Sequence, residues 1–391
     1  MGGSPTLAGM VEGDAADRWQ RFGRWSEIEP ACVSGRGPDQ RPFFAGHDAY
    51  SRMDLVRTAI NEIRVGWERR AQYMSELRGL LDVSAAEDLD AQAMARVQRL
   101  FATRRSWDDS ASSLQDDYGV LRLYTSKVGY DMIFRAINAG YRSAGLTSDP
   151  GLLRGATFLV ELLSIDLFHF RASNALADEY TGIVYRGMSL AAADMTRFLE
   201  AARGPVGERY IAVPLAMVSA SLDPHVAMRF ALEDAARDAT RQLLLWEIQV
   251  VALDPALMDV YRRSFPHSVV TSLCAVPIAS VSDYPGEQEV LLRGPHFQIL
   301  DVTECDAAEF GRPVRRLRVL MHNTNRDHIT ARASNAGADK AERDLFRALV
   351  LCDRFRACSR LAAGAGLEAD ARDYGRMAQE QLISTCSSDR P

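Results

Sequence analysis

Lysine is nearly absent from this 391-residue chain, which has only Lys127 and Lys340 among its 46 basic residues. Arginine therefore carries almost all of the positive charge, and chemistry that depends on a lysine amine is disfavoured. The net charge of −6 also leaves no overall basic field that would attract a polyanion. We therefore expect a protein that does not bind nucleic acid.

The spacings typical of metal sites are missing as well. The six cysteines form no Cys-x-x-Cys pair and no dense framework, which favours free thiols in a reducing compartment. The seven histidines form no His-Glu-x-x-His pattern, and there is no calcium-binding loop. The sequence therefore predicts no metal site. The cysteines are Cys32, Cys274, Cys305, Cys352, Cys358 and Cys386, and the histidines are His47, His169, His225, His267, His296, His322 and His328.

Long hydrophobic runs are lacking too. The apolar stretch at 155–170 is interrupted by Glu161 and Asp166, and the N-terminus has no basic start followed by an apolar segment. We expect no membrane span and no export by the general secretory route.

Three common motifs for nucleotide or nucleophile chemistry are absent. There is no Gly-x-Gly-x-x-Gly that opens a helix, no Gly-x-x-x-x-Gly-Lys phosphate loop and no Gly-x-Ser-x-Gly elbow. A dinucleotide, if one binds here, is not held in the manner of a doubly wound α/β fold.

Hydrophobic periodicity divides the chain into four parts. Apolar residues recur at steps of three and four from Met53 to Leu81, which predicts a long amphipathic helix, and 88–103 repeats the pattern before a polar linker at 105–117. Two further helical patterns, 341–361 and 370–383, predict a hairpin near the C-terminus. The expected division is an irregular segment at 1–48, a helical segment at 49–114, a domain that contains strand-like runs at 115–325 and a C-terminal helical hairpin at 326–391.

Within the third part, the pattern changes from helical to strand-like after residue 177. Short runs rich in β-branched and aromatic residues are bounded by Gly, Pro and Asp, and helices intervene mainly in the earlier portion. This irregular alternation favours an α+β fold with mixed sheets over a regular β-α repeat. The predicted strands lie at 183–185, 210–213, 243–250, 289–292 and 297–300.

Three short polar motifs lie in or beside these runs: Tyr185-Arg186-Gly187 at an expected strand start, Ser219-Ala220-Ser221 and Glu287-Gln288-Glu289. An enzyme that breaks the nicotinamide–ribose bond of NAD needs a fixed cation for the diphosphate, and an arginine fork supplies it better than a lysine. It also needs a carboxylate beside the ribose, because cleavage passes through an oxocarbenium-like transition state. Arg186 and Glu289 are the residues of those two types.

The remaining polar residues complete this hypothesis. Ser219 could orient the ribose side of the site. Alternation along a strand would place Glu287 and Glu289 on one face about 7 Å apart, so that Glu287 could meet an incoming nucleophile. A guanidinium with a pKa above about 12 needs such a carboxylate to hold it and to take up its proton. Asp223-Pro224-His225 predicts a helix start, where a histidine is typically structural.

The three motifs resemble the arginine-type mono-ADP-ribosyltransferases, a family shared by clostridial binary toxins and vertebrate ecto-enzymes, which carry an Arg, a Ser-x-Ser and a Glu-x-Glu on three strands. The resemblance covers roughly 116–303. It includes VYRGM at 184–188, AMRFA at 227–231, YPGEQEVLL at 284–292 and the helical LYTSKVGYDMIFRAINAGYR at 123–142. The sequence departs from the family at Ala220, where the family has Thr, and at 213–218, which lacks the usual aromatic.

The resemblance implies a core of two packed mixed β-sheets and NAD as co-substrate, with no metal. It implies a protein partner that carries an acceptor arginine, and an enzyme that works in the cytosol or is delivered into a host cytosol as an effector. The implied catalytic residues are Arg186, Ser219, Glu287 and Glu289; the implied NAD contacts are Arg186, Gly187, Ser219, Ser221 and Glu289; and the implied contacts with the substrate protein are Tyr284 and Glu287.

Two alternatives stay open. An NAD glycohydrolase would use the same residues and pass ADP-ribose to water. A non-enzymatic interaction module would carry an inactive transferase fold, consistent with Ala220 and the missing aromatic. In that case Arg186 would pair at a strand end, and the serines and glutamates would be ordinary strand residues.

Overall fold

The structure is a computed structural model that describes residues 69–84, 119–129, 133, 150–173, 180–212, 217–266, 269–272, 274–293, 296–327 and 336–387. The predicted irregular segment at 1–48, the helix at 88–103, the linker at 105–117 and much of 123–142 lie outside these residues. The four predicted domain boundaries therefore stay predictions. No helix among the described residues is long and apolar enough to cross a bilayer.

Eight of the described strands form one sheet, in which β4 and β9 pair in parallel and the other neighbours pair antiparallel. Its order is β2-β8-β9-β4-β1-β3-β7-β6, and a single residue pair, Tyr185 with Ser221, joins β1 to β3. The strands are β1 (Gly182–Leu190), β2 (Tyr210–Ala212), β3 (Val218–Ser221), β4 (Gln242–Val251), β6 (Ala275–Pro277), β7 (Glu289–Leu292), β8 (His296–Glu304) and β9 (Val314–His322); β5 (Val269–Thr271) and β10 (Asn325–Asp327) form a separate pair.

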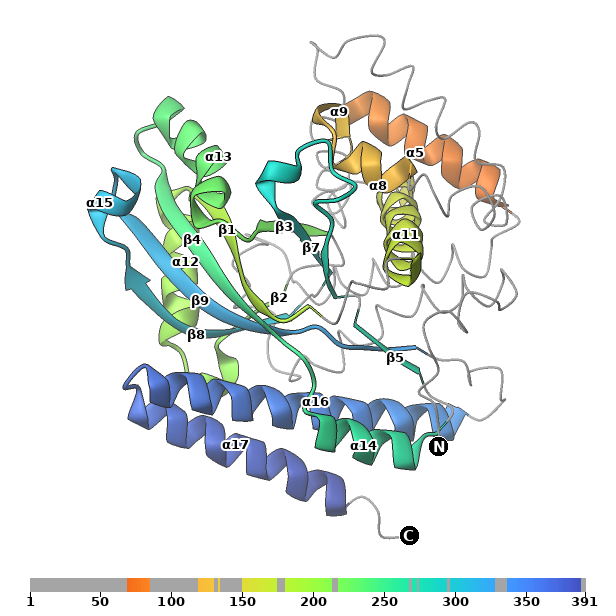
Figure 1. The fold of residues 1–391 in the computed structure, drawn as a ribbon, viewed down its shortest axis with the longest axis vertical. Helices are drawn as coiled ribbons and strands as arrows, with labels where there is room; N and C mark the ends of the chain where they lie inside the picture. The colour runs from red at the N-terminus through yellow and green to blue at the C-terminus, as the bar shows by residue number, and fades with distance from the viewer. Residues whose placement is uncertain are drawn as a thin grey trace.

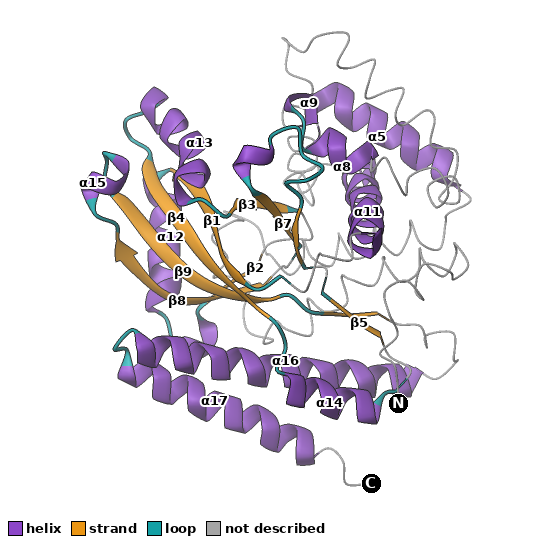
Figure 2. Ribbon diagram, viewed as in Figure 1, coloured by secondary structure: helices purple, strands orange, loops and turns teal. Residues whose placement is uncertain are grey.

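The main core lies between two parts of this sheet, β2-β8-β9-β4-β1 and β3-β7-β6. Trp246 of β4 is fully buried and packs edge-on against Phe198 and Phe297. The same cluster takes in Val184 of β1 and Val290 of β7, so both parts share one apolar interior. Together with the helices along its sides (Figure 2), this arrangement confirms the predicted α+β class with mixed pairing.

The helices before and between the strands are α5 (Arg70–Ser84), α8 (Gly119–Tyr124), α9 (Lys127–Gly129), α11 (Pro150–Ser173), α12 (Ala192–Arg203), α13 (Pro224–Arg237), α14 (Pro255–Ser264) and α15 (Ala307–Phe310), with 3-10 turns η6 (Val206–Glu208) and η7 (Pro285–Glu287). Figure 1 shows α5, α8 and α11 grouped beside the β3 and β7 edge. Buried Asp166 of α11 accepts hydrogen bonds from the backbone N–H groups of Val120 and Leu121 at 2.8 and 3.0 Å. This carboxylate therefore caps the start of α8, and it explains why an acidic residue interrupts the apolar stretch.

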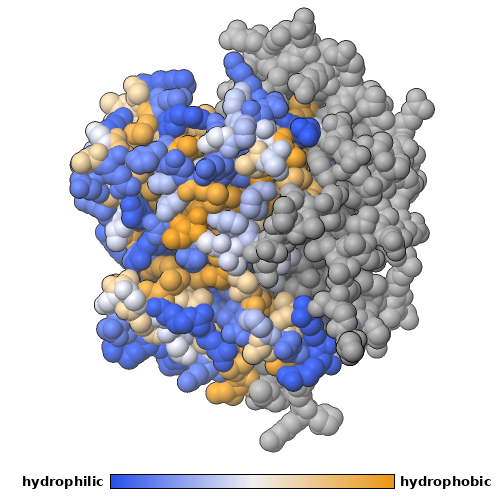
Figure 3. Space-filling view, in the orientation of Figure 1, coloured by the Kyte–Doolittle hydropathy of each residue, from blue (hydrophilic) through white to orange (hydrophobic). Residues whose placement is uncertain are grey.

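The predicted C-terminal helices are present as α16 (Ala336–Gly364) and α17 (Glu368–Ser387), which pack against each other as a hairpin. The Tyr374 hydroxyl donates to the carbonyl of Ile299 in β8 at 2.9 Å, and Arg209 pairs with Asp370 at 2.6 Å. Apolar residues gather where the hairpin meets the sheet, and the outer surface of α17 is mostly hydrophilic (Figure 3). The hairpin thus covers one side of the strands.

Strand β9, with the sequence VRRLRVLMH, was not among the predicted strands. Its arginines find partners on neighbouring elements: Arg318 forms an ion pair with Asp301, Arg316 with Glu309 at 3.3 Å, and Arg315 donates to Gln242 at 3.1 Å. The apolar residues between them are buried. Cross-strand charge pairing therefore stabilises a strand whose composition resembles a solvated segment.

Candidate functional site

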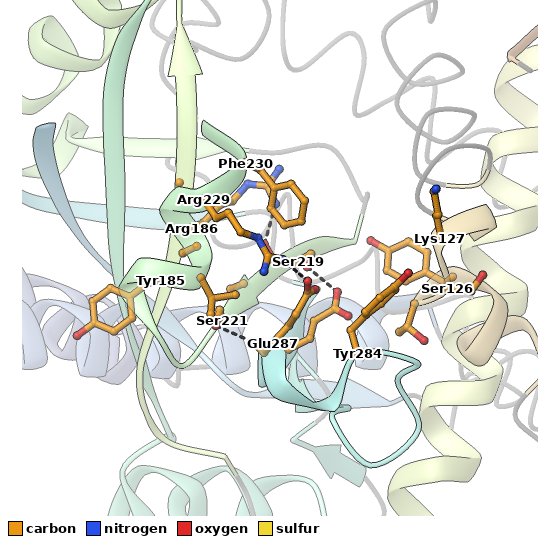
Figure 4. A pocket seen from close by; sticks show the side chains of 17 residues that line it. Ser126, Lys127, Tyr185, Arg186, Ser219, Ser221, Arg229, Phe230, Tyr284 and Glu287 are labelled. Carbon is orange, nitrogen blue, oxygen red and sulfur yellow. Dashed lines mark hydrogen bonds and ion pairs between the residues drawn. The ribbon is translucent and has the colours of Figure 1, made fainter. Parts of the chain in front are cut away.

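A pocket of roughly 470 Å³ lies where β1, β3, β7 and α13 meet α8 and α9 (Figure 4). This volume is in the usual range for a small-molecule site. All seven residues that the sequence singled out line it, although they come from three segments spread over about a hundred residues of the chain. They are Arg186, Gly187, Ser219, Ser221, Tyr284, Glu287 and Glu289, and the other lining residues are Tyr124, Thr125, Ser126, Lys127, Tyr185, Ala220, Val226, Ala227, Arg229 and Phe230.

Arg186 lies in the middle of β1, opposite Trp246 of β4, and not at a strand start as its sequence context predicted. The strand continues because residues 187–190 also pair with β4. The Arg186 Nη1 atom donates to the backbone carbonyl of Ser219 at 2.7 Å. The guanidinium therefore bridges β1 and β3 at the point where only one residue pair joins them.

Ser219 and Glu289 form the polar centre of the pocket. The Ser219 hydroxyl donates to the Glu289 Oε1 atom at 2.5 Å, across the antiparallel pairing of β3 and β7. Burial raises the pKa of the Glu289 carboxyl to about 7, and the negative charge of Glu287 adds to the rise, whereas the Ser219 hydrogen bond and the Arg186 charge act against it. The ionised form of this carboxyl is unfavourable in its partly buried position, and a cationic ligand nearby would stabilise it.

This raised pKa has a consequence for stability. A carboxyl whose pKa is 4.5 in the unfolded chain and about 7 in the fold makes its full contribution to stability below pH 4.5 and loses it as the pH rises through 7. We expect Glu289→Gln to raise the melting temperature at pH 8 by about 2–4 °C, and to change it little at pH 4.5. Calorimetry of both proteins at the two pH values measures this difference. A variant that melts at or below the wild-type temperature at pH 8 would show that the ionised Glu289 carboxylate does not destabilise the fold.

Glu287 does not lie on the strand with Glu289, so the expectation of two carboxylates on one pleated face is wrong. Glu287 ends the η7 turn, and Gln288 adopts a left-handed conformation with φ 47° before β7 begins at Glu289. The reversal at Gln288 breaks the strand alternation on which the estimate of 7 Å depended. Glu287 nevertheless lines the pocket, where its carboxylate forms an ion pair with Arg229 of α13.

The second serine has a different set of contacts from the first. The Ser221 hydroxyl donates to the Glu287 backbone carbonyl at 2.7 Å and accepts from the Asp223 N–H at 3.0 Å. Asp223 in turn caps α13 by accepting from the His225 N–H at 2.8 Å, which confirms the predicted helix start. Ser221 therefore fixes the turn that carries Glu287 relative to α13.

Gly187 allows α13 to lie close against β1. A Cβ atom at this position would be 2.2 Å from the backbone carbonyl oxygen of Ala227, which no side chain could tolerate without a shift of the helix. The glycine is thus required by packing as well as being part of the pocket wall.

The wall formed by α8 and α9 was not predicted from the sequence, nor were the four pocket residues of α13, which are Val226, Ala227, Arg229 and Phe230. Tyr124 is buried, its hydroxyl has no hydrogen-bond partner among the described residues, and burial followed by the Glu289 charge raises the pKa of its phenol. Lys127, which is exposed, is one of only two lysines, and that rarity was the available signal. Phe230 and Tyr284 are each 43% exposed at the pocket, which suits stacking against a planar ring.

The pocket therefore combines three basic groups, Arg186, Arg229 and Lys127, with two carboxylates. The basic groups can bind an anionic ligand, and Glu289 can stabilise positive charge that develops on it. Aromatic side chains at the rim supply a surface for a planar group.

Comparisons with known proteins found similarity to solved structures. No protein-family model and no curated protein match the chain. The ADP-ribosyltransferase Vis in complex with agmatine is 16% identical over 68% of this chain and 88% of that one, with a TM-score of 0.26. The Vis toxin from Vibrio splendidus is 14% identical over 69% of this chain and 88% of that one, with a TM-score of 0.25. The type III effector XopAI from Xanthomonas axonopodis pv. citri is 12% identical over 79% of this chain and 100% of that one, with a TM-score of 0.31. At these identities and TM-scores the similarity carries no argument, and the chemistry of the site rests on its own geometry.

Proposed function

We propose that this chain is a mono-ADP-ribosyltransferase that breaks the nicotinamide–ribose bond of NAD and passes ADP-ribose to an arginine side chain of a protein. The observation that carries the proposal is the triad of Arg186, Ser219 and Glu289. Three separate strands bring these side chains into one pocket, and the carboxylate is partly buried.

In the proposed reaction, the bond between ribose C1 and the nicotinamide nitrogen breaks, and nicotinamide leaves with the electron pair. The ribose becomes cationic, and ionised Glu289 stabilises it at the position that the Ser219 hydrogen bond fixes. Arg186 binds the diphosphate through its planar fork. Glu287, on the turn beside the pocket, holds the acceptor guanidinium and takes up its proton.

Tyr284 is the proposed contact with the substrate protein. It is exposed and lies just before the turn that carries Glu287, so a protein bound there would present its arginine to the pocket. Figure 4 shows its side chain near Glu287.

An NAD glycohydrolase is the second candidate, and one contact favours it. The Arg229 guanidinium forms an ion pair with Glu287, the carboxylate assigned to the acceptor. A water molecule that attacks the ribose would not need to bind Glu287. The first half of the reaction and the roles of Arg186, Ser219 and Glu289 would be the same.

Replacing Glu287 by Gln should separate transfer from hydrolysis. We expect transfer to a guanidino acceptor to fall by about a hundredfold or more, because the amide cannot take up the guanidinium proton, while formation of free ADP-ribose persists. Quantifying ADP-ribosylated agmatine and free ADP-ribose from the same reaction measures both activities. Glu233→Gln is the matched control, since Glu233 is exposed on α13 and does not line the pocket.

Two outcomes would count against this assignment. If transfer and hydrolysis fall together, Glu287 serves NAD and the inference of an arginine acceptor loses its main support. If wild-type protein forms free ADP-ribose and no modified agmatine, the glycohydrolase is correct.

A further inference from the structure

Arg229 places a guanidinium of the chain itself against the acceptor carboxylate. Its Nη2 atom forms an ion pair with the Glu287 Oε1 atom, and both residues line the pocket that contains Glu289. Figure 4 shows the Arg229 side chain reaching from α13 toward Glu287. Among the described arginines, Arg229 and Arg186 line this pocket, and Arg186 donates instead to the Ser219 carbonyl.

The position of Arg229 follows from fixed backbone elements. Close packing of Ala227 on Gly187 and the Asp223 cap hold the first turns of α13 against β1 and β3. The Arg229 guanidinium carbon also lies 4.8 Å from the centre of the Phe230 ring. The Arg229 side chain can still change its conformation, because 48% of it is exposed, compared with 28% for the Glu287 side chain.

We propose that Arg229 is an acceptor in cis, so that the protein modifies itself at this residue. This inference rests on the proposed function, in which Glu287 holds the acceptor guanidinium. An external arginine would have to displace Arg229 from Glu287, whereas Arg229 already makes that contact. An acceptor on the same chain also needs no second binding event.

Transfer to Arg229 replaces one bond at ribose C1 by another. The bond between ribose C1 and nicotinamide breaks, and nicotinamide leaves with the electron pair. A guanidinium nitrogen of Arg229 forms the new bond to C1, and its proton passes to the Glu287 carboxylate and then to water. The product carries ADP-ribose in place of one hydrogen on the Arg229 side chain.

Modification at Arg229 would limit further turnover. The attached diphosphate adds negative charge beside Glu287 and weakens the ion pair that the free side chain makes. The attached group would also fill the pocket that a new NAD molecule must enter. We therefore expect about one ADP-ribose per chain at this residue and a reaction rate that falls as Arg229 is modified.

The test is to incubate the purified full chain with NAD and to map the modified residues by mass spectrometry, with and without agmatine. The wild-type map should place ADP-ribose on Arg229, with a rate per molecule independent of protein concentration, as a reaction in cis requires. In Arg229→Lys, which keeps the positive charge, modification should fall at least tenfold. Arg237→Lys is the control, because Arg237 is exposed on the last turn of α13 and lies outside the pocket; this variant should be modified as the wild type is.

The outcomes separate this inference from the proposed function. Modified agmatine with an unmodified Arg229 in the wild type would overturn the inference and leave the proposed function standing. Modification of Arg229 only at high protein concentration would overturn the reaction in cis. If the wild type releases no nicotinamide from NAD, both proposals fail. The wild-type map decides the matter even if Arg229→Lys does not fold.

Discussion

Replacing Glu289 by Gln should reduce the release of nicotinamide from NAD by about a hundredfold or more. The carboxylate has a raised pKa because it is buried, and a cationic ribose is the partner that lowers its energy. The amide has almost the same shape and can still accept the Ser219 hydrogen bond, so the loss would come from the missing charge. Transfer and hydrolysis should fall together, since both need the same bond to break.

The same variant should keep much of its affinity for NAD, because Arg186 and the rim aromatics remain. Calorimetric titration with NAD measures the binding, and chromatography of released nicotinamide measures the rate. Glu304→Gln serves as the control, since Glu304 is on β8 and outside the pocket. Near-normal turnover in Glu289→Gln would remove Glu289 from the mechanism.

Replacing Arg186 by Lys should lower kcat/KM for NAD by about a hundredfold. Lysine keeps the charge but has no planar fork, and it cannot contact the diphosphate and the Ser219 carbonyl with the same geometry. Two charge-assisted hydrogen bonds, each contributing about 1.5–3 kcal/mol, account for an effect of this size. Most of the loss should appear as weaker NAD binding.

Steady-state kinetics over a range of NAD concentrations tests this expectation. Arg203→Lys is a suitable control, because Arg203 is exposed at the end of α12 and does not line the pocket. If Arg186→Lys leaves both the KM for NAD and the turnover unchanged, Arg186 is outside the binding site and the triad loses its phosphate-binding member.

The sequence was sufficient to select the main residues of the candidate site. Arg186, Ser219 and Glu289 could be selected because each is a polar residue within a short apolar run, and such runs become adjacent strands of one sheet. Their chemical types then suggested a shared task before any contact was known. These residues line one pocket, while their roles in catalysis stay predictions.

Other features depend on contacts that a one-dimensional pattern does not contain. The place of Glu287 depends on the left-handed turn at Gln288, a conformation that is uncommon for residues other than glycine. Strand β9 depends on carboxylates from β8 and α15 that neutralise its arginines. Tyr124 lines the pocket at the end of α8, and the start of that helix is capped by Asp166, more than forty residues further along the chain.

The products formed from NAD test most directly whether this pocket breaks the bond between nicotinamide and ribose. Wild-type protein should be incubated with NAD labelled in its ribose, and nicotinamide, free ADP-ribose and protein-bound ADP-ribose should be quantified together. We expect nicotinamide to appear in an amount equal to the sum of free and bound ADP-ribose. NAD that remains intact, although the protein binds it, would contradict the proposal and identify the chain as a binding module.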